Sequence, residues 1–263
     1  MGQGKAVNGS VKGIFMKRTI FLDGQYLKVN GQMVEAFTPG VFQAQGVFET
    51  MLGLEGAVLD IDLHLKRLRS GLKRLGIKTP SIKPAVLNEV LRRNQLATGR
   101  VRLMVWHAGK QTHVLALALP YKMPADKNYK VCLIKAGRPA NARSADIKSL
   151  DYRSFADAFA KARAQGFDEA LLINSKGHIS EASRSNIFWV QGKVLYTPPL
   201  SSGCLNGITR QQVIRQARLL KITVKERNLT PKVLGGADTA FLTNSLSGIK
   251  PIEVKKIRNI TAD

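Results

Sequence analysis

The chain has little cysteine, few aromatic residues and no long apolar run. Only two cysteines, Cys132 and Cys204, occur in 263 residues, and they lack the spacing of a disulfide framework or a metal site. Such sparse cysteine is typical of a reducing compartment. No apolar stretch approaches the roughly 20 residues that a membrane-spanning helix needs. These absences argue against a disulfide-stabilised secreted domain and against a helical membrane protein, and they predict a cytoplasmic location.

Acidic residues are also scarce, with 18 Asp and Glu against 41 Lys and Arg, so the formal net charge is +23. A strongly basic protein often binds nucleic acid, because Lys and Arg release counterions from phosphates. Here the basic residues are scattered, aromatic residues make up only 6% of the chain, and no nucleic-acid-binding motif occurs. Nucleic-acid binding is therefore a distant alternative. A positive surface that attracts an anionic substrate or cofactor, or that keeps the chain soluble, is the simpler interpretation.

The chain is long enough to bury a sizeable core, and its helical and strand patterns alternate. This alternation predicts an α/β fold of α+β layers. We expect a disordered basic leader over 1–18, a smaller N-terminal domain over 19–119, a linker over 120–127 and a larger C-terminal domain over 128–263. The longest apolar piece of the leader has three residues, too few for a signal peptide, so Met16 is a candidate natural start.

Apolar periodicity predicts individual elements within these domains. In the first half we expect a hairpin with its turn at Asp23-Gly24, helices near 62–76 and 84–97, and strands at 101–105 and 113–119. In the second half we expect a helix over 155–163 that ends at Gly166, strands at 170–173, 186–190 and 240–242, and a helix that begins at Ile208. The helix that begins at Asp62 has an apolar stripe of Leu63, Leu68, Leu72 and Leu75, which is expected to face the core.

Short motifs follow one another along the chain, each weak alone and stronger in this order. They are Gly46-Val47-Phe48-Glu49-Thr50, His64-Leu65-Lys66-Arg67-Leu68, Ile147-Lys148-Ser149-Leu150-Asp151-Tyr152, Glu181-Ala182-Ser183-Arg184-Ser185-Asn186, Gly203-Cys204-Leu205-Asn206-Gly207-Ile208-Thr209-Arg210 and Thr239-Ala240-Phe241-Leu242-Thr243-Asn244-Ser245. The set resembles the active-site core of class IV aminotransferases, the fold-type IV pyridoxal phosphate (PLP) enzymes. The resemblance implies the two-domain fold of these enzymes, PLP as the cofactor, and a homodimer.

Lys148 and Glu181 match the lysine and glutamate with which that family holds its cofactor. A lysine amine bonds to an aldehyde only when it is neutral, so Lys148 needs a desolvated or cation-flanked pocket. It precedes the helix expected at 155–163, and an entry turn can aim it into a crevice. A buried carboxylate at Glu181 would keep the pyridine nitrogen of PLP protonated. Glu181 is expected in a short connection near a sheet end, although an ordinary loop carboxylate is the competing interpretation.

Phosphate binding requires backbone N–H groups or a fixed cation. Gly207, Ile208 and Thr209 open the helix expected at 208, where free N–H groups favour an anion. Thr243 and Asn244 offer a second group of donors, although on pattern alone each of these two sites is more often a helix cap or a polar turn. Arg67 matches the family's phosphate-binding arginine, and a planar bidentate donor suits phosphate. On the helix pattern alone, Arg67 would be a solvated surface residue.

Three activities compete within the family: aminodeoxychorismate lyase, branched-chain aminotransferase and D-amino-acid aminotransferase. The Thr243-Asn244-Ser245 ending and the short lysine motif resemble the lyase branch, which converts 4-amino-4-deoxychorismate to pyruvate and 4-aminobenzoate, a folate precursor. Asp151 replaces the Asn usual after the lysine. Phe48, Thr50, Tyr152 and Ser245 are candidate residues around cofactor and substrate, although strand aromatics more often belong to a core. The resemblance therefore implies a PLP-dependent carbon–oxygen lyase, with a transaminase as the alternative.

Overall fold

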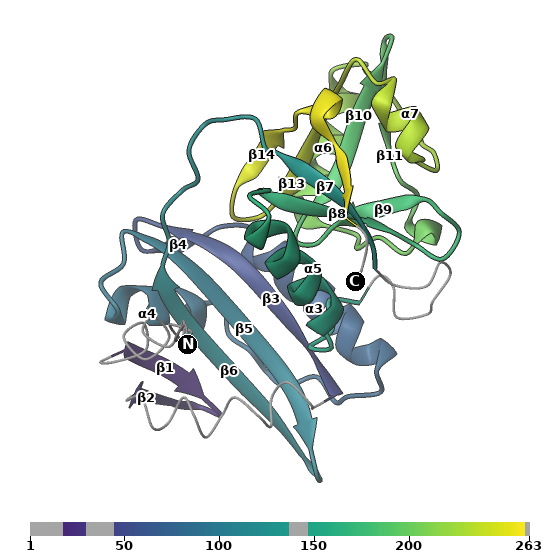
Figure 1. Ribbon diagram of the computed structural model, residues 1–263. Helices are drawn as coiled ribbons and strands as arrows, with labels where there is room; N and C mark the ends of the chain where they lie inside the picture. The colour runs from purple at the N-terminus through teal and green to yellow at the C-terminus, as the bar shows by residue number, and fades with distance from the viewer. Residues whose placement is uncertain (1–17, 30–44, 137–146, 261–263) are drawn as a thin grey trace, which may run out of the picture. The chain divides into compact units, whose positions relative to one another are not determined.

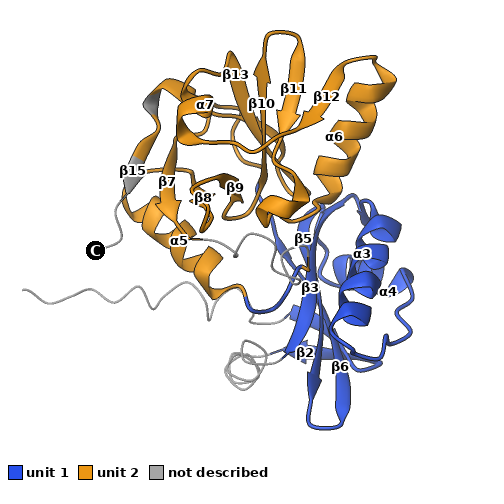
Figure 2. Ribbon diagram, turned by 90° about the vertical axis from the view of Figure 1, so that its right-hand side faces the viewer, with its two compact units in different colours: residues 1–122, 148–151 blue, residues 123–147, 152–263 orange. Residues whose placement is uncertain are grey.

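The computed structural model describes residues 18–29, 45–136 and 147–260. It divides into two compact units, shown in Figure 2: unit 1 comprises 1–122 and 148–151, and unit 2 comprises 123–147 and 152–263. The division after Lys122 falls inside the stretch 120–127 that its prolines single out. Both units combine sheets with helices, which confirms the predicted α/β class. The predicted leader lies outside the described residues up to residue 17, and Arg18 already begins a strand.

Unit 1 is built on one antiparallel sheet with the strand order β2-β1-β6-β5-β3-β4 (Figure 1). Its strands are β1 (Arg18–Leu22), β2 (Gln25–Val29), β3 (Gln45–Leu54), β4 (Ala57–Val58), β5 (Thr98–Ala108) and β6 (Gln111–Pro120). The predicted hairpin is present, since β1 pairs with β2 across a turn in which Asp23 and Gly24 both adopt positive φ. The 10-residue β3 and 11-residue β5 form the long centre of the sheet.

Two helices, α3 (Ile61–Arg74) and α4 (Ala85–Arg93), cover one face of this sheet (Figure 2). The stripe of α3 that faces the sheet consists of His64, Leu65, Leu68, Gly71 and Leu72, all buried. Leu63 was wrongly included in the predicted stripe, because it is 40% exposed. The buried residues of α3, at positions 64, 65, 68, 71 and 72, form one face of the helix, and Leu63 lies just outside this face.

The segment Lys148–Asp151 belongs to unit 1, although the sequence analysis placed Lys148 with residues 128–263. Ser149 forms an antiparallel bridge with Val47 of β3, and Leu150 donates its N–H to the Gly46 carbonyl at 3.0 Å. Gly46 is required at this contact, because a Cβ there would lie 2.4 Å from the Val105 carbonyl oxygen. Backbone pairing over about a hundred residues of sequence therefore fixes the lysine segment beside β3.

Unit 2 contains two sheets. The four-stranded sheet has the order β15-β7-β8-β9 and the five-stranded sheet the order β12-β11-β10-β13-β14. The strands are β7 (Val131–Lys135), β8 (Glu169–Ile173), β9 (Ile179–Ala182), β10 (Asn186–Gln191), β11 (Val194–Thr197), β12 (Thr223–Glu226), β13 (Thr239–Asn244), β14 (Gly248–Pro251) and β15 (Arg258–Ile260). Trp189, Leu171 and Leu242 belong to a buried cluster that joins strands of both sheets.

Over its described residues, unit 2 is completed by three α-helices and two short 3-10 turns: α5 (Arg153–Ala164), α6 (Ile208–Leu219), α7 (Pro231–Gly235), η1 (Leu200–Ser202) and η2 (Val254–Lys256). Helix α5 buries Phe155, Ala158 and Ala162. It terminates where predicted, because Gly166 has φ +81° and the Phe167 N–H bonds back to the Ala162 carbonyl at 3.0 Å. The helix predicted from Ile208 is also confirmed.

Glu181 lies in a strand of unit 2. The sequence analysis placed it in a connection between strands, but it lies within β9 and pairs with Leu172 of β8. The segment Ile179–Ala182 is fully buried, and its four residues lack the length and the apolar alternation that identify a strand from sequence. Pairing with β8 decides its conformation.

Candidate active site

Lys148 is half-buried and lies beside Phe48. Its carbonyl accepts the Phe48 N–H at 2.9 Å, and its Nζ lies 4.6 Å from the centre of the Phe48 ring. The Arg102 guanidinium carbon lies 5.0 Å from the same ring, so two cationic groups flank one buried aromatic side chain. An aromatic face attracts a cation. Phe48 therefore contacts the lysine head group, and Thr50 shares its face of β3 because side chains alternate along a strand.

Arg67 is paired with a buried carboxylate on the other face of β3. Its Nε and Nη2 donate to Glu49 Oε1 and Oε2 at 2.8 and 2.6 Å. His64 Nδ1 lies 2.7 Å from Glu49 Oε2. Burial by itself would raise the pKa of Glu49, but the charge and hydrogen bonds of Arg67 and His64 outweigh it and lower the pKa to about 2. The Arg67 side chain is 13% exposed, so the solvated position suggested by the helix pattern is wrong.

Phe48 and Glu49 lie in the stretch of β3 next to the Lys148 segment. β4 pairs only with Gly53 and Leu54, so the preceding residues of β3 border the Lys148 segment instead of another full strand. Because side chains alternate along a strand, Phe48 and Glu49 point to opposite faces of the sheet, the first toward Lys148 and the second toward Arg67.

Glu181 is 5% exposed, and its Oε2 accepts the Leu205 N–H at 3.1 Å. The neighbouring Asn186 donates from Nδ2 to the Leu205 carbonyl at 2.7 Å. Glu181 and Asn186 thus hold both backbone groups of Leu205, two residues before the N-cap of α6. The loop that leads into this helix is fixed by side chains of β9 and β10.

Gly207 is the N-cap residue of α6, and among the described residues no side chain caps this helix. A Cβ at Gly207 would lie 2.1 Å from Asn186 Oδ1, so only glycine fits. Ile208 is buried and Thr209 half-buried in the first turn. The first N–H groups of an uncapped helix lack intrahelical partners and favour an anion.

Thr243 lies next to this helix start, because it pairs with Asn186 across β13 and β10. Its Oγ1 is buried and has no hydrogen-bond partner in the part of the chain that the structure describes. Such a group is costly unless a ligand or water satisfies it. Asn244 instead uses its side chain within the protein: Nδ2 donates to Ser185 Oγ at 2.9 Å, and Oδ1 accepts the N–H groups of Leu246 and Ser247. Ser245 lies in this turn.

Tyr152 is half-buried and stacks on Phe155 at 5.0 Å between ring centres. Its hydroxyl donates to the Ser183 carbonyl. Ser183 and Ser185 donate from their hydroxyls to the buried Glu169 carboxyl group. Burial, the largest effect, raises the pKa of Glu169, and the nearby Arg184 and serine hydroxyls only partly oppose it. Tyr152 and the Glu169 carboxyl group thus hold the turn between Glu181 and Asn186.

Three residues that support the site received no role in the sequence analysis: Glu49, Asn186 and Glu169. Glu49 and Asn186 lie inside quoted motifs, and a charged or amide residue within an apolar strand is a signal of a buried hydrogen bond. Their partners are 15 to 19 residues away, so sequence spacing could not identify them.

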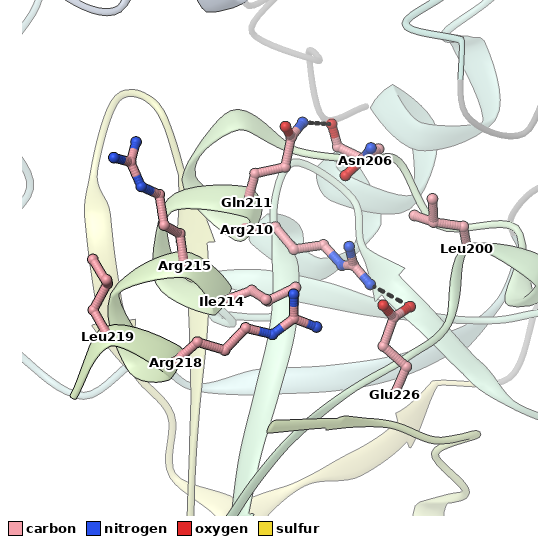
Figure 3. A pocket seen from close by; sticks show the side chains of 9 residues that line it. All are labelled: Leu200, Asn206, Arg210, Gln211, Ile214, Arg215, Arg218, Leu219 and Glu226. Atoms are coloured by element: carbon pink, nitrogen blue, oxygen red, sulfur yellow. Dashed lines mark hydrogen bonds and ion pairs between the residues drawn. The ribbon is translucent and has the colours of Figure 1, made fainter. Parts of the chain in front are cut away.

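An open groove of about 530 Å³ runs along α6, as Figure 3 shows. Its lining residues are Leu200, Asn206, Arg210, Gln211, Ile214, Arg215, Arg218, Leu219 and Glu226. Arg210 Nη2 donates to Glu226 at 2.9 Å, which neutralises part of the positive charge. The groove contains none of Lys148, Glu181 and Thr243, so we do not assign the chemistry to it.

Metal and thiol chemistry find no support in the described residues. Over these ranges, no group of three or more His, Cys, Asp or Glu side chains could hold a metal ion. Cys132 and Cys204 are buried free thiols, and burial, the largest effect in both, raises their pKa values to about 11 and about 12. A neutral buried thiol is a poor nucleophile.

Comparison with known proteins identifies the family. The family model for amino-transferase class IV matches residues 46–254. The chain belongs to the class IV aminotransferases. It is 32% identical over 248 residues to a putative branched-chain-amino-acid aminotransferase of Methanocaldococcus jannaschii, covering 89% of this chain and 86% of the relative. It is also 31% identical over 254 residues to an aminodeoxychorismate lyase of Bacillus subtilis, covering 88% and 85%.

A solved structure agrees with this membership of the class IV aminotransferases. The branched-chain aminotransferase of Thermoproteus uzoniensis, solved with norvaline, superposes with a TM-score of 0.79 at 27% identity, covering 91% of this chain and 87% of the other. Enzymes of this family depend on PLP, and the cofactor of the chain is therefore PLP. Within the described ranges, no helix is long and apolar enough to cross a membrane.

The residues present suit PLP in two respects. The start of α6 is uncapped among the described residues, as an anion site requires, and beside it the buried Thr243 hydroxyl lacks a protein partner. Glu181 supplies a buried carboxylate opposite in sign to a protonated pyridine nitrogen.

Proposed function

We propose that this class IV aminotransferase is an aminodeoxychorismate lyase, which converts 4-amino-4-deoxychorismate to 4-aminobenzoate and pyruvate. The observation that carries the choice is the Thr243-Asn244-Ser245 turn, which resembles the lyase branch and whose Asn244 forms a hydrogen-bonded turn with Leu246 and Ser247. The 31% identity to the Bacillus subtilis lyase supports it. The reaction would then supply 4-aminobenzoate as a folate precursor.

Each site residue has a role in this proposal. Lys148 holds the cofactor covalently, with Phe48 against its head group, and Tyr152 and Thr50 as further contacts. Glu181 faces the pyridine nitrogen. The backbone of Gly207, Ile208 and Thr209 binds the phosphate together with Thr243 and Arg67, and Asn244 shapes the adjacent turn that contains Ser245.

The chemistry divides between cofactor and protein. Bound PLP supplies an electron sink for the pair left when a proton departs from the carbon that bears the substrate amine. The substrate amine would first displace Lys148 from the cofactor, which would leave Lys148 a neutral amine able to take that proton as general base. The carbon–oxygen bond to the pyruvate unit would then break with its electron pair on the oxygen. The departing enolpyruvate would take up a proton to give pyruvate, and the ring would become aromatic. Glu181 would face the pyridine nitrogen, and a carboxylate there would favour the protonated form of that nitrogen.

A transaminase is the second candidate, because the relatives in Methanocaldococcus jannaschii and Thermoproteus uzoniensis are named branched-chain aminotransferases. A transaminase returns the proton to the cofactor carbon and releases a keto acid. It then stops until a second keto acid restores the cofactor. Branched-chain and D-amino acids are the alternative substrates. Homodimer formation and a cytoplasmic location also stay predictions.

One kinetic experiment separates the two candidates. Purified protein saturated with PLP is incubated with aminodeoxychorismate and no keto acid, and pyruvate and 4-aminobenzoate are quantified over many turnovers. We expect sustained, equal release of both products. The cofactor bound to the protein absorbs in the near-visible range. A transaminase would instead lose this absorption rapidly with L-leucine or D-alanine, regain it with 2-oxoglutarate, and show no activity on aminodeoxychorismate.

A second experiment tests the role of Lys148. Borohydride should fix the cofactor to the peptide that contains Lys148, which mass spectrometry of a digest detects. The Lys148→Ala variant should lose turnover yet retain PLP noncovalently, because phosphate binding depends on other residues. The matched control Lys135→Ala, at the exposed end of β7, should keep both. Steady-state turnover by Lys148→Ala would show that the assignment is wrong.

A further inference from the structure

We propose that Glu49 is a positioning residue for phosphate recognition: it orients Arg67, through a two-bond contact, so that the guanidinium group is held ready for the cofactor phosphate. The inference rests on the proposed function, in which Arg67 binds that phosphate. Two further residues then contribute to phosphate recognition without touching the cofactor: Glu49, through its buried carboxylate, and its partner His64.

The contact between Arg67 and Glu49 fixes the plane of the guanidinium group. Two parallel hydrogen bonds of 2.8 and 2.6 Å join Nε and Nη2 to the two carboxylate oxygens. A single bond would leave the group free to rotate about it, whereas a bidentate contact does not. Nη1 belongs to the opposite edge of the guanidinium group. An arginine carries five N–H donors, so one carboxylate on one edge is compatible with a phosphate on another.

His64 holds the carboxylate in turn. Its Nδ1 lies 2.7 Å from Glu49 Oε2, and both side chains are only 1% exposed. Because an ionised carboxylate only accepts, Nδ1 carries a hydrogen in this contact. Glu49 therefore accepts three hydrogen bonds from two residues of α3. His64 and Arg67 lie three residues apart on one face of the helix, which places both above the same strand residue.

Ordering in advance is the physical benefit of this arrangement. A free arginine side chain has rotamer entropy to lose on binding. Arg67 has already lost most of its freedom, so phosphate binding need not order it again. A purely structural link between β3 and α3 is the competing explanation, and it predicts that loss of Glu49 lowers stability without regard to phosphate.

Affinity for PLP and for pyridoxal, which lacks the phosphate, distinguishes the two explanations. Both ligands are titrated by their near-visible absorption against the full-length protein, the Glu49→Gln variant and the matched control Glu89→Gln. Glu89 also pairs with two arginines, Arg92 and Arg93, but on the exposed face of α4. Folding of each variant is monitored by far-UV circular dichroism.

We expect Glu49→Gln to raise the dissociation constant of PLP about 10–100-fold, the scale for residues that orient a ligand-binding group. The dissociation constant of pyridoxal should change less than about threefold, and Glu89→Gln should change neither. Equal weakening of both ligands, or no weakening of either, would overturn the inference.

If Glu49→Gln folds poorly, a second comparison tests the inference: Arg67→Met against the Arg67→Met, Glu49→Gln double variant. In an Arg67→Met background, a further Glu49→Gln change should no longer weaken PLP binding, because its effect passes through Arg67. An undiminished effect in that background contradicts the inference. Failure of the proposed function is separately visible, since the unmodified protein would then bind PLP but release no pyruvate from aminodeoxychorismate.

Discussion

Two buried threonines of unit 2 differ in how their hydroxyls are satisfied. Thr197 Oγ1 donates to the Ile187 carbonyl at 2.9 Å, whereas Thr243 Oγ1 has no partner among the described residues. Both side chains are at most 2% exposed. A hydroxyl that the protein leaves unsatisfied beside an uncapped helix is best explained by a ligand, while a satisfied one contributes to folding.

The two corresponding valine variants should therefore behave in opposite ways. Thr243→Val is expected to weaken PLP binding by about 1 kcal/mol, roughly fivefold, and to leave the stability of the apo protein unchanged or higher. Thr197→Val is expected to lower the free energy of unfolding by about 1 kcal/mol with PLP affinity retained. PLP titration and urea unfolding of each apo variant measure the two effects. An unchanged PLP affinity in Thr243→Val would remove this residue from the phosphate site.

At the scale of elements, the start of α6 depends on one close contact. Gly207 has no room for a Cβ because Asn186 Oδ1 occupies that space, and the same Asn186 holds the Leu205 carbonyl. Strand β10 thereby sets the position of the helix start. The phosphate site is in this sense a property of two packed elements and of no single residue.

Gly207→Ala is expected to displace the first turn of α6. We expect a loss of about 1–3 kcal/mol of stability from overpacking, together with weaker PLP binding. Gly235→Ala is the matched control: this glycine ends α7, a Cβ added there would meet nothing within 4 Å, and the change should be neutral or slightly stabilising. Thermal unfolding and PLP titration report both. If Gly207→Ala binds PLP normally, the backbone at this helix start does not contact the phosphate.

At the scale of the whole molecule, two buried carboxyl groups make stability depend on pH with opposite signs. The pKa of Glu49 is lowered from 4.5 to about 2, so the unfolded chain binds its proton more readily. Glu49 therefore contributes stability above about pH 4.5, and this is lost as the pH falls toward 2. The pKa of Glu169 is raised by burial, so its contribution is present at low pH and is lost as the pH rises through its folded value.

Urea unfolding between pH 2 and pH 7, followed by far-UV circular dichroism, tests these signs. The Glu49→Gln variant should lose less stability on acidification than the unmodified protein, by on the order of 3 kcal/mol between pH 4.5 and pH 2. The Glu169→Gln variant should instead lose less stability than the unmodified protein as the pH rises above 4.5. Parallel pH profiles for all three proteins would contradict the charge states assigned to both groups.

The sequence by itself determined the elements with strong periodicity and the order of the motifs. Helices α5 and α6, the β1–β2 hairpin and strands β5 and β6 follow from apolar spacing and turn residues, which act over a few neighbours. Motif order sufficed to indicate the family, and with it the cofactor, because Lys148, Glu181 and Gly207 each carry a recognisable local setting. The +23 charge, in contrast, gave no function.

Only the tertiary structure decided how these residues are supported. Glu49 with Arg67, Glu181 with Leu205 and Asn186 with Gly207 are contacts between side chains or backbone groups 18 to 24 residues apart in sequence. Lys148 joins unit 1 through pairing with β3, and Glu181 becomes a strand residue through pairing with β8. Hydrogen-bond partners of buried polar groups are selected by packing across elements, and a local pattern carries no information about which elements meet.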